Sequence, residues 1–203
     1  MAFVSEVFKP SDPRSISDLI RSHPLAWVVS QTPEGLRGST IPILAHCDAD
    51  GRVIRLEGHF PRRNPQVKGL RTDPGALFLF IGPHSYISPG MVRDKTWGPT
   101  WNFAHAQFQA RVEFFEASDL MEAHLRRLID AMEKYRDAPW SLDDMGPRYR
   151  GLMDHIIGFN AYVDDAQHRF KLGQDERPEI FADICDALGD TPLQRLMREH
   201  RQD

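Results

Sequence analysis

Short hydrophobic runs that alternate with polar residues predict β-strands over the first part of the chain. Three such runs cover Leu25–Ser30, Leu36–His46 and Val53–Leu56. The segments between them, Pro33-Glu34-Gly35 and Asp48-Ala49-Asp50-Gly51, are rich in the residues that tight turns prefer. Because short turns join antiparallel neighbours, we expect three consecutive antiparallel strands here.

Later segments extend this sheet. Ala76–Ile81 is apolar on both faces, as expected of an interior strand, and Phe103–Phe115 alternates over the length of a long strand. Between them, Gly82–Pro99 is rich in glycine, proline and aromatic residues, which indicates a long functional loop. Gly158–Val163 has strand character, and we expect Arg169–Leu172 to continue it as a hairpin. Six or seven strands joined mostly by hairpins predict a closed or split barrel.

Apolar residues three or four positions apart predict helices around the barrel. Ile16, Leu19 and Ile20 give a short helix one apolar face, and this helix is expected to end before Pro24. Further helices are predicted over Asn64–Leu70, Asp119–Met132 and Arg148–His155, with two short ones beyond Pro178. The predicted fold class is therefore mainly β with peripheral helices (α+β).

The composition is that of an ordinary globular protein. The chain has 203 residues, 41% hydrophobic and 27% charged, which suits one domain with an appended helical part. Its apolar runs are far shorter than the roughly 20 residues that span a bilayer, and its first residues lack the features of a secretion signal, so we expect a cytoplasmic protein without a membrane segment. A net charge of -4 gives no overall attraction for nucleic acid phosphates.

Two neighbouring arginines are the first candidates for ligand binding. Arg62 and Arg63 follow a predicted strand and precede a predicted helix. Guanidinium groups and free backbone N–H groups at such a position can converge on a phosphate. A solvated basic turn is the alternative, because exposed arginine pairs are common.

Aromatic and hydroxyl side chains form a second group of candidates. Tyr86, Trp101 and Asn102 could hold a flat heterocycle by stacking and by placed hydrogen bonds. The alternative is a rigid loop whose rings only pack on the barrel. Pro42 lies within a predicted strand, where it removes a backbone donor, so the hydroxyls of Ser39 and Thr40 could face a ligand.

Other classes of site have little support in the sequence. Four histidines that stand alone on different elements lack the spacing of metal ligands, and no metal site is predicted: His46, His59, His84 and His105. There is no G-x-S-x-G motif for a covalent hydrolase. The segment Phe181–His200 fits a helix-turn-helix badly, so DNA binding has no motif to support it.

Five motifs together resemble the PaiB-type FMN-binding negative transcriptional regulators. They are Gly58-His59-x3-Arg63-Asn64-Pro65, Gly82-Pro83-His84-x-Tyr86-Ile87-Ser88-Pro89, Pro99-Thr100-Trp101-Asn102-Phe103, Ile157-Gly158-Phe159 and Arg169-Phe170-Lys171-Leu172-x-Gln174. The resemblance extends from about residue 3 to 179, so we expect an FMN-binding domain over residues 1–179 and a helical extension over residues 180–203. It implies an FMN-binding split β-barrel, and a homodimer with one flavin at each end of its interface.

The resemblance also suggests which residues hold the flavin. Ser39, Thr40 and Ile41 would border the isoalloxazine ring and the ribityl chain, and Arg62 and Arg63 would bind the phosphate. His59 and Asn64 from the same loop are further cofactor candidates. Four more would act across the dimer or stack on the ring: Tyr86, Trp101, Lys171 and Gln174.

The sequence departs from the family pattern at two places. Phe103 stands where the family usually has tyrosine, which removes a hydroxyl group. The familiar Lys-Leu-Ser-Gln-Asn is Lys171-Leu172-Gly173-Gln174-Asp175 here, so an acid replaces an amide near a cofactor edge.

Three functional hypotheses follow. The first is an FMN-binding regulator in which the flavin is a ligand or a redox sensor. The second is an FMN-dependent oxidoreductase acting on an unidentified small molecule, for which no catalytic residue can be named from the sequence. The third is a barrel that binds haem instead, with His59, His84 or His105 as an axial ligand.

Overall fold

Seven antiparallel strands form one curved sheet in the computed structural model, which describes residues 6–10 and 12–201. The strands are β1 (Leu25–Thr32), β2 (Gly35–Pro42), β3 (Leu44–Cys47), β4 (Val53–Pro61), β5 (Gly75–Ile87), β6 (Thr100–Phe115) and β7 (Ile156–Lys171). Their order is β2-β1-β5-β6-β7-β4-β3. The two edge strands are consecutive in the chain and are joined through Ile43, so the sheet curls until its edges meet. The prediction of a mainly β split barrel with helices is confirmed.

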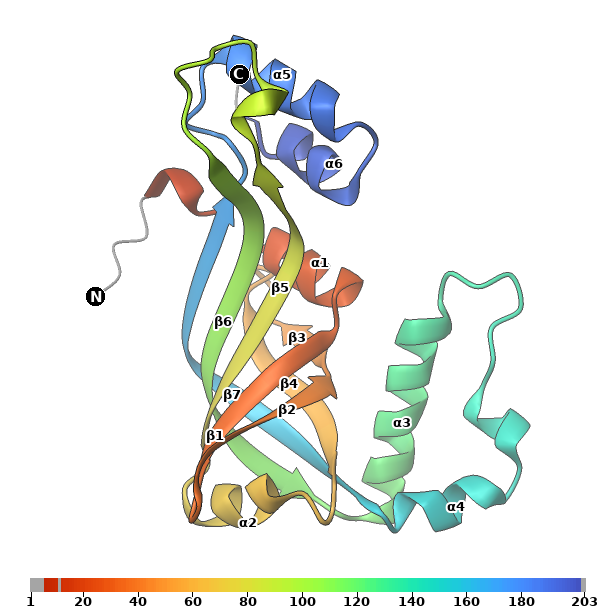
Figure 1. Ribbon diagram of the computed structural model, residues 1–203. Helices are drawn as coiled ribbons and strands as arrows, with labels where there is room; N and C mark the ends of the chain where they lie inside the picture. Colours follow the sequence, from red (N-terminus) through yellow and green to blue (C-terminus); the bar gives the residue numbers. More distant parts are fainter. Residues whose placement is uncertain (1–5, 11, 202–203) are drawn as a thin grey trace.

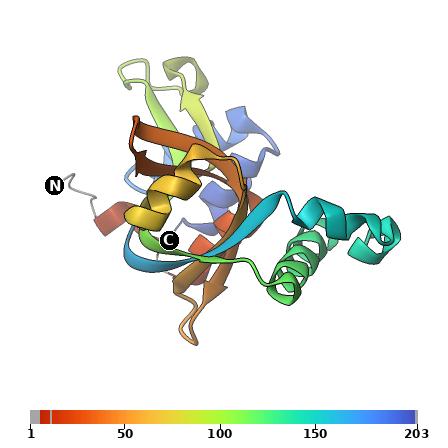
Figure 2. The ribbon, with the colours of Figure 1, turned by 90° about the horizontal axis from the view of Figure 1, so that it is seen from below.

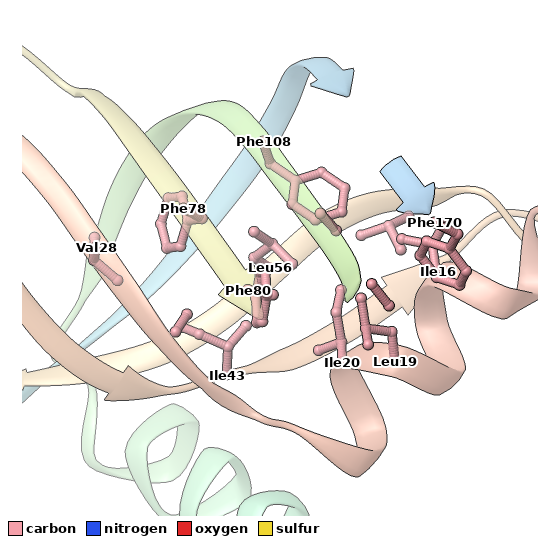
Figure 3. Close-up of a cluster of buried hydrophobic side chains, with 14 of the residues drawn as sticks. Ile16, Leu19, Ile20, Val28, Ile43, Leu56, Phe78, Phe80, Phe108 and Phe170 are labelled. Atoms are coloured by element: carbon pink, nitrogen blue, oxygen red, sulfur yellow. The ribbon is translucent and has the colours of Figure 1, made fainter. Parts of the chain in front are cut away.

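The inner face of the sheet forms the core. Phe78, Phe80 and Phe108 point inward from β5 and β6 and are almost wholly buried (Figure 3). Helix α1 (Arg14–Ser22) adds Leu19 and Ile20 from one side, as its apolar spacing predicts. Burial of these large side chains is the main stabilising contribution to the barrel.

Helices cover the ends and one side of the barrel. Helix α2 (Pro65–Thr72) lies across the lower end (Figure 2). An arm built from α3 (Ser118–Glu133), η3 (Leu142–Met145) and α4 (Arg148–Met153) projects to one side and has its own small apolar cluster. Helices α5 (Pro178–Leu188) and α6 (Pro192–Glu199) lie at the upper end, η2 (Pro89–Met91) follows β5, and η1 (Glu6–Phe8) precedes α1.

Two sequence predictions about strands are wrong. The expected loop over Gly82–Pro99 begins as strand, because β5 continues to Ile87 through an irregularity between Ile81 and His84. The expected hairpin after Val163 is absent from the described residues, where β7 runs without interruption to Lys171. Its polar middle still pairs with β6, and Asp164 forms an ion pair with Arg111 across the two strands. Polar residues on the outer face of a strand resemble a turn in sequence.

The C-terminal helices pack on the barrel. Ile184 of α5 and Met197 of α6 are buried in the same apolar cluster as the barrel interior. The predicted domain boundary between residues 179 and 180 falls inside α5, which begins at Pro178. This boundary stays a prediction. Within the described part of the chain, the helices are too short or too polar to cross a membrane.

Candidate functional site

A hydrogen-bonded cluster joins β2 to the start of α2. Asn64 caps α2, because its side-chain oxygen accepts from the backbone N–H of Gln66 at 2.9 Å. The Asn64 amide nitrogen donates to Ser39 Oγ at 2.8 Å, and Ser39 Oγ donates to Gln66 Oε1 at 2.5 Å. Gln66 is fully buried and its amide nitrogen bonds to Ser30 Oγ at 2.9 Å. Strand β2 and the start of α2, which are far apart in the sequence, therefore form one rigid unit, which we call the β2–α2 unit.

The two candidate phosphate ligands have different surroundings. Arg62 donates from Nε to the carbonyl oxygen of Asp154 at 2.9 Å and forms an ion pair with Glu116. Glu116 also pairs with Arg71, and these hydrogen bonds hold the pKa of its carboxyl below the usual range. Arg63 is exposed, and within the described chain it makes no hydrogen bond or ion pair. Arg62 thus fastens the barrel to the arm, whereas the Arg63 guanidinium has no bonding partner within the described chain.

The three candidates on β2 point to opposite faces. Ile41 is 5% exposed and lies in the core, and the Ser39 side chain turns toward α2. Thr40 is exposed on the outer face, opposite Trp27 of β1. A Cβ at Gly38 would lie 3.3 Å from Cε3 of Trp27, so this indole covers the backbone of β2. A ligand on the outer face would meet Thr40, Trp27 and backbone groups of Ser39 and Ile41.

Tyr86, Trp101, Lys171 and Gln174 belong to the other end of the barrel, where β5 ends, β6 begins and β7 ends (Figure 1). Tyr86 near the end of β5 pairs with Trp101 near the start of β6, and their ring centroids are 5.9 Å apart. Both rings are about half exposed. Lys171 reaches this strand pair from β7, where it bonds to the Thr100 hydroxyl and to the carbonyl oxygen of Trp101 at 3.3 Å. One chain therefore does not bring this aromatic group together with Arg63.

Gln174 has a structural role. Its amide nitrogen donates to the carbonyl oxygen of Phe170 at 2.6 Å, and its oxygen accepts from the backbone N–H of Leu172 at 2.7 Å. The turn that it closes contains Gly173 at a φ of +78°, a conformation that favours glycine over the family's serine. The departure at Asp175 places its acid on the surface, and Phe103 lies beneath the guanidinium of Arg169 at 5.9 Å from the ring centroid.

A buried carboxylate and two histidines form a further group that the sequence did not reveal. Glu57 of β4 accepts from His124 of α3 at 2.8 Å, and the other nitrogen of His124 lies 2.9 Å from Nδ1 of His59. Glu57 also bonds to His46 and to Arg127, both at 2.7 Å. The sequence alone shows only that Glu57 and His59 are two positions apart and so lie on the same face of a strand. It gives no sign of His124, which is 65 positions away from His59.

Burial and hydrogen bonding set the charges in this group. Burial alone would raise the pKa of Glu57, but the hydrogen bonds from His124, His46 and Arg127 outweigh it and hold the pKa well below its usual range. Burial, with His124 close by, lowers the pKa of His59 from its ordinary 6.5 to about 4. Glu57 is therefore ionised and His59 neutral at pH 7.

The three histidines that were candidates for haem ligands have different surroundings and form no common site. His59 belongs to the group just described, and His84 bonds through Nδ1 to the carbonyl oxygen of Gly82 at 2.9 Å. Burial lowers the pKa of His105 on the outer face of β6. Among the described residues, no three His, Cys, Asp or Glu side chains are grouped to hold a metal ion.

Known proteins share both the sequence pattern and the fold. A family model described as "Putative FMN-binding domain" matches residues 2–165. The curated protein "Protease synthase and sporulation protein PAI 2" (PaiB) of Bacillus subtilis is 26% identical over 204 residues, covering 99% of this chain and 97% of its own. An uncharacterized protein of Emericella nidulans is 26% identical, covering 79% of each chain.

Solved structures with lower sequence identity have the same architecture. An FAD and heme binding protein from Mycobacterium smegmatis superposes with a TM-score of 0.61 at 16% identity, covering 82% of this chain and 74% of its own. A conserved hypothetical protein from Mycobacterium tuberculosis gives a TM-score of 0.57 at 14% identity, covering 83% and 91%. At such identities the likeness concerns the fold alone.

Proposed function

Because this chain belongs to the family of the "Putative FMN-binding domain" and is an FMN-binding protein similar to PaiB, we propose that two copies hold one flavin at each end of their interface. The flavin then serves as a ligand or redox sensor. When bound, FMN supplies one- and two-electron chemistry, and the protein positions it. The expected cytoplasmic location stays a prediction.

The β2–α2 unit suits the phosphate end of FMN. Arg63 offers a guanidinium that no carboxylate neutralises within the described residues, and the positive end of the α2 dipole lies beside it. The Asn64 cluster fixes the loop that carries Arg63, so little order has to be gained on binding. Trp27 and Thr40 then border the surface on which the ring would lie.

The outer face of β1 and β5 suits a second copy of the chain. Leu25, Trp27 and Ile81 expose 61%, 55% and 56% of their surfaces there, and Leu79 lies between them, half-buried. Contiguous exposed apolar side chains of this size are typical of a protein interface. This face adjoins Thr40, so a second copy placed on it would cover the flavin.

The separation of the two candidate groups is the observation that carries the proposal. Arg63 lies at the α2 end, and Tyr86, Trp101 and Lys171 lie at the opposite end (Figure 1). An antiparallel pairing of two copies would bring the aromatic end of one to the α2 end of the other. Each flavin would then contact both protomers, and a single chain would supply only half of the site.

The regulator hypothesis depends on the likeness to PaiB. Arg195 of α6 is paired with Asp190, and Arg198 lies 4.0 Å from Asp186. Leu193 and Met197 of the same helix are buried. A recognition helix presents free basic and polar side chains to DNA, so α6 does not support direct DNA reading. Regulation through the flavin or through a partner fits this structure better.

An FMN-dependent oxidoreductase is the second candidate. The exposed Tyr86 and Trp101 rings and the buried His59–His124–Glu57 group favour it, because stacking surfaces and proton-transfer groups are what such enzymes add to a flavin. Rapid reduction of the bound flavin by NADH or NADPH would support turnover.

Ile81→Asp tests the shared site. The charge would disrupt the apolar face, so we expect a monomer in analytical ultracentrifugation that has lost most of its FMN binding in an absorbance titration. Ile54→Asp on β4, 49% exposed and away from this face, is the matched control and should leave both properties unchanged. A wild-type monomer that binds FMN fully would overturn the interface proposal.

A further inference from the structure

The buried group under α3 is arranged as a linear chain of hydrogen bonds. Glu57 and His59 project outward from β4, since Leu56, Gly58 and Phe60 face the core. Helix α3 covers them and inserts His124 between them, with no exposed surface. Glu57 itself is 1% exposed. We call Glu57, His124 and His59 the Glu57 relay.

With His124 in its neutral form, the hydrogen bonds of the relay place the protons on both rings. An ionised carboxylate only accepts, so Nδ1 of His124 must donate to Glu57. In that neutral form Nε2 of His124 has no proton and accepts from Nδ1 of His59. His59 is neutral as well, so its own Nε2 has no proton.

This last nitrogen is open to ligands. Within residues 6–10 and 12–201, Nε2 of His59 has no hydrogen-bond partner, and it is not among the buried polar atoms that lack one. It therefore reaches solvent on the outer face of β4. A Cβ at Gly58 would lie 3.2 Å from Cγ2 of Ile41, so β2 lies against β4 here. Thr40 and His59 are the chain neighbours of these two residues and point to the outer side of their strands.

We propose that the Glu57 relay, with His124 neutral, presents the unprotonated Nε2 of His59 as a proton acceptor to an N–H or O–H group of the flavin or of a substrate lying on it. The inference rests on the proposed function and deepens it. His59 would touch the ligand, and Glu57 and His124 are positioning residues that act through it.

The proton transfer balances within the relay. A proton from the ligand bonds to Nε2 of His59, and the proton on Nδ1 passes to Nε2 of His124. His124 becomes an imidazolium next to the Glu57 carboxylate, and His59 is neutral again in its other tautomer. Arg127 and His46 also face Glu57, from α3 and β3, and Asn160 lies opposite it on β7. Arg127 balances the carboxylate at rest, so the relay keeps His59 neutral until a ligand supplies the proton.

Nitrogen-15 NMR of selectively labelled histidines tests the relay without any turnover. In the protein without FMN we expect His59 to carry its proton on Nδ1 and to lack one on Nε2. Glu57→Gln should weaken this preference, because the amide no longer anchors His124 by charge. Glu122→Gln, a carboxylate on α3 that bonds to Arg126 and Tyr149, is the control and should leave it unchanged. A proton on Nε2 of His59 in the wild type would overturn the inference.

Addition of FMN separates the two proposals. If FMN binds by absorbance and the Nε2 signal of His59 shifts, the relay faces the ligand. If FMN binds and the signal does not move, the relay only fastens α3 and the inference fails. If FMN does not bind at all, the proposed function fails. The inference then fails as well, because the flavin is the ligand that it names. His59→Asn, which can still donate to His124 but has no Nε2, should alter the pH dependence of the bound flavin's absorbance.

Discussion

The side-chain amide of Asn64 donates to the hydroxyl of Ser39 across 2.8 Å, although the two residues are 25 positions apart. This contact connects the start of α2 to β2, and it fixes the loop that carries Arg63. In the proposed function, the backbone at Ser39 and the Arg63 side chain then bind the same ligand.

Loss of the Asn64 side chain should reduce both stability and flavin affinity. Asn64→Ala removes the α2 cap and the bond to Ser39, so we expect the free energy of unfolding to fall by about 1–2 kcal/mol. Asn64→Asp keeps the oxygen that caps the helix and removes only the donor to Ser39. Its free energy of unfolding should therefore lie between those of the wild type and Asn64→Ala. Urea denaturation measures the stabilities; equal values for all three proteins would show that the cluster does not hold α2.

Gly69 provides a test of the packing of α2 on β1. A Cβ there would lie 2.4 Å from the backbone oxygen of Gln31, which cannot rotate away. We expect Gly69→Ala to lower the free energy of unfolding by about 2–3 kcal/mol. Gly151→Ala, in α4 with open space around it, should raise it by up to about 1 kcal/mol. A Gly69→Ala protein as stable as the wild type would contradict the packing of this helix.

Stability should fall as the pH is lowered from about 6.5 to 4. The pKa of His59 is about 4 in the folded chain and near 6.5 when unfolded, so the unfolded state binds the proton first. This histidine alone contributes an upper limit of about 3 kcal/mol. Glu57, whose folded pKa is depressed, adds a loss of stability in the same direction below its ordinary value of 4.5.

Burial also lowers the pKa of His168 to about 4, so His168 adds to the same loss of stability. Comparing the wild type with His59→Asn isolates the contribution of His59. The variant should have a flatter dependence of unfolding free energy on pH between 6.5 and 4. Thermal or urea unfolding at several pH values gives both curves. Parallel curves would mean that His59 does not resist protonation in the folded protein.

Local patterns in the sequence predicted the barrel but not the long-range contacts of its site. Turn residues after Thr32 and Cys47 and the apolar run of β5 were enough to predict antiparallel strands. The polar middle of β7 was not, because only pairing with β6 distinguishes it from a turn. Arg62 could not be separated from Arg63, since its partner Glu116 comes from another strand's end. His124 joins Glu57 through the docking of α3, which no local pattern encodes.

The most direct test of the central claim is a pair of absorbance titrations, with FMN and with riboflavin, on the wild type and on Arg63→Ala. If the β2–α2 unit holds the flavin phosphate through Arg63, the variant should bind FMN roughly tenfold to a hundredfold more weakly and bind riboflavin as the wild type does. Arg52→Ala, on an exposed turn, should leave both unchanged. Equal FMN affinities of the wild type and Arg63→Ala would contradict the account.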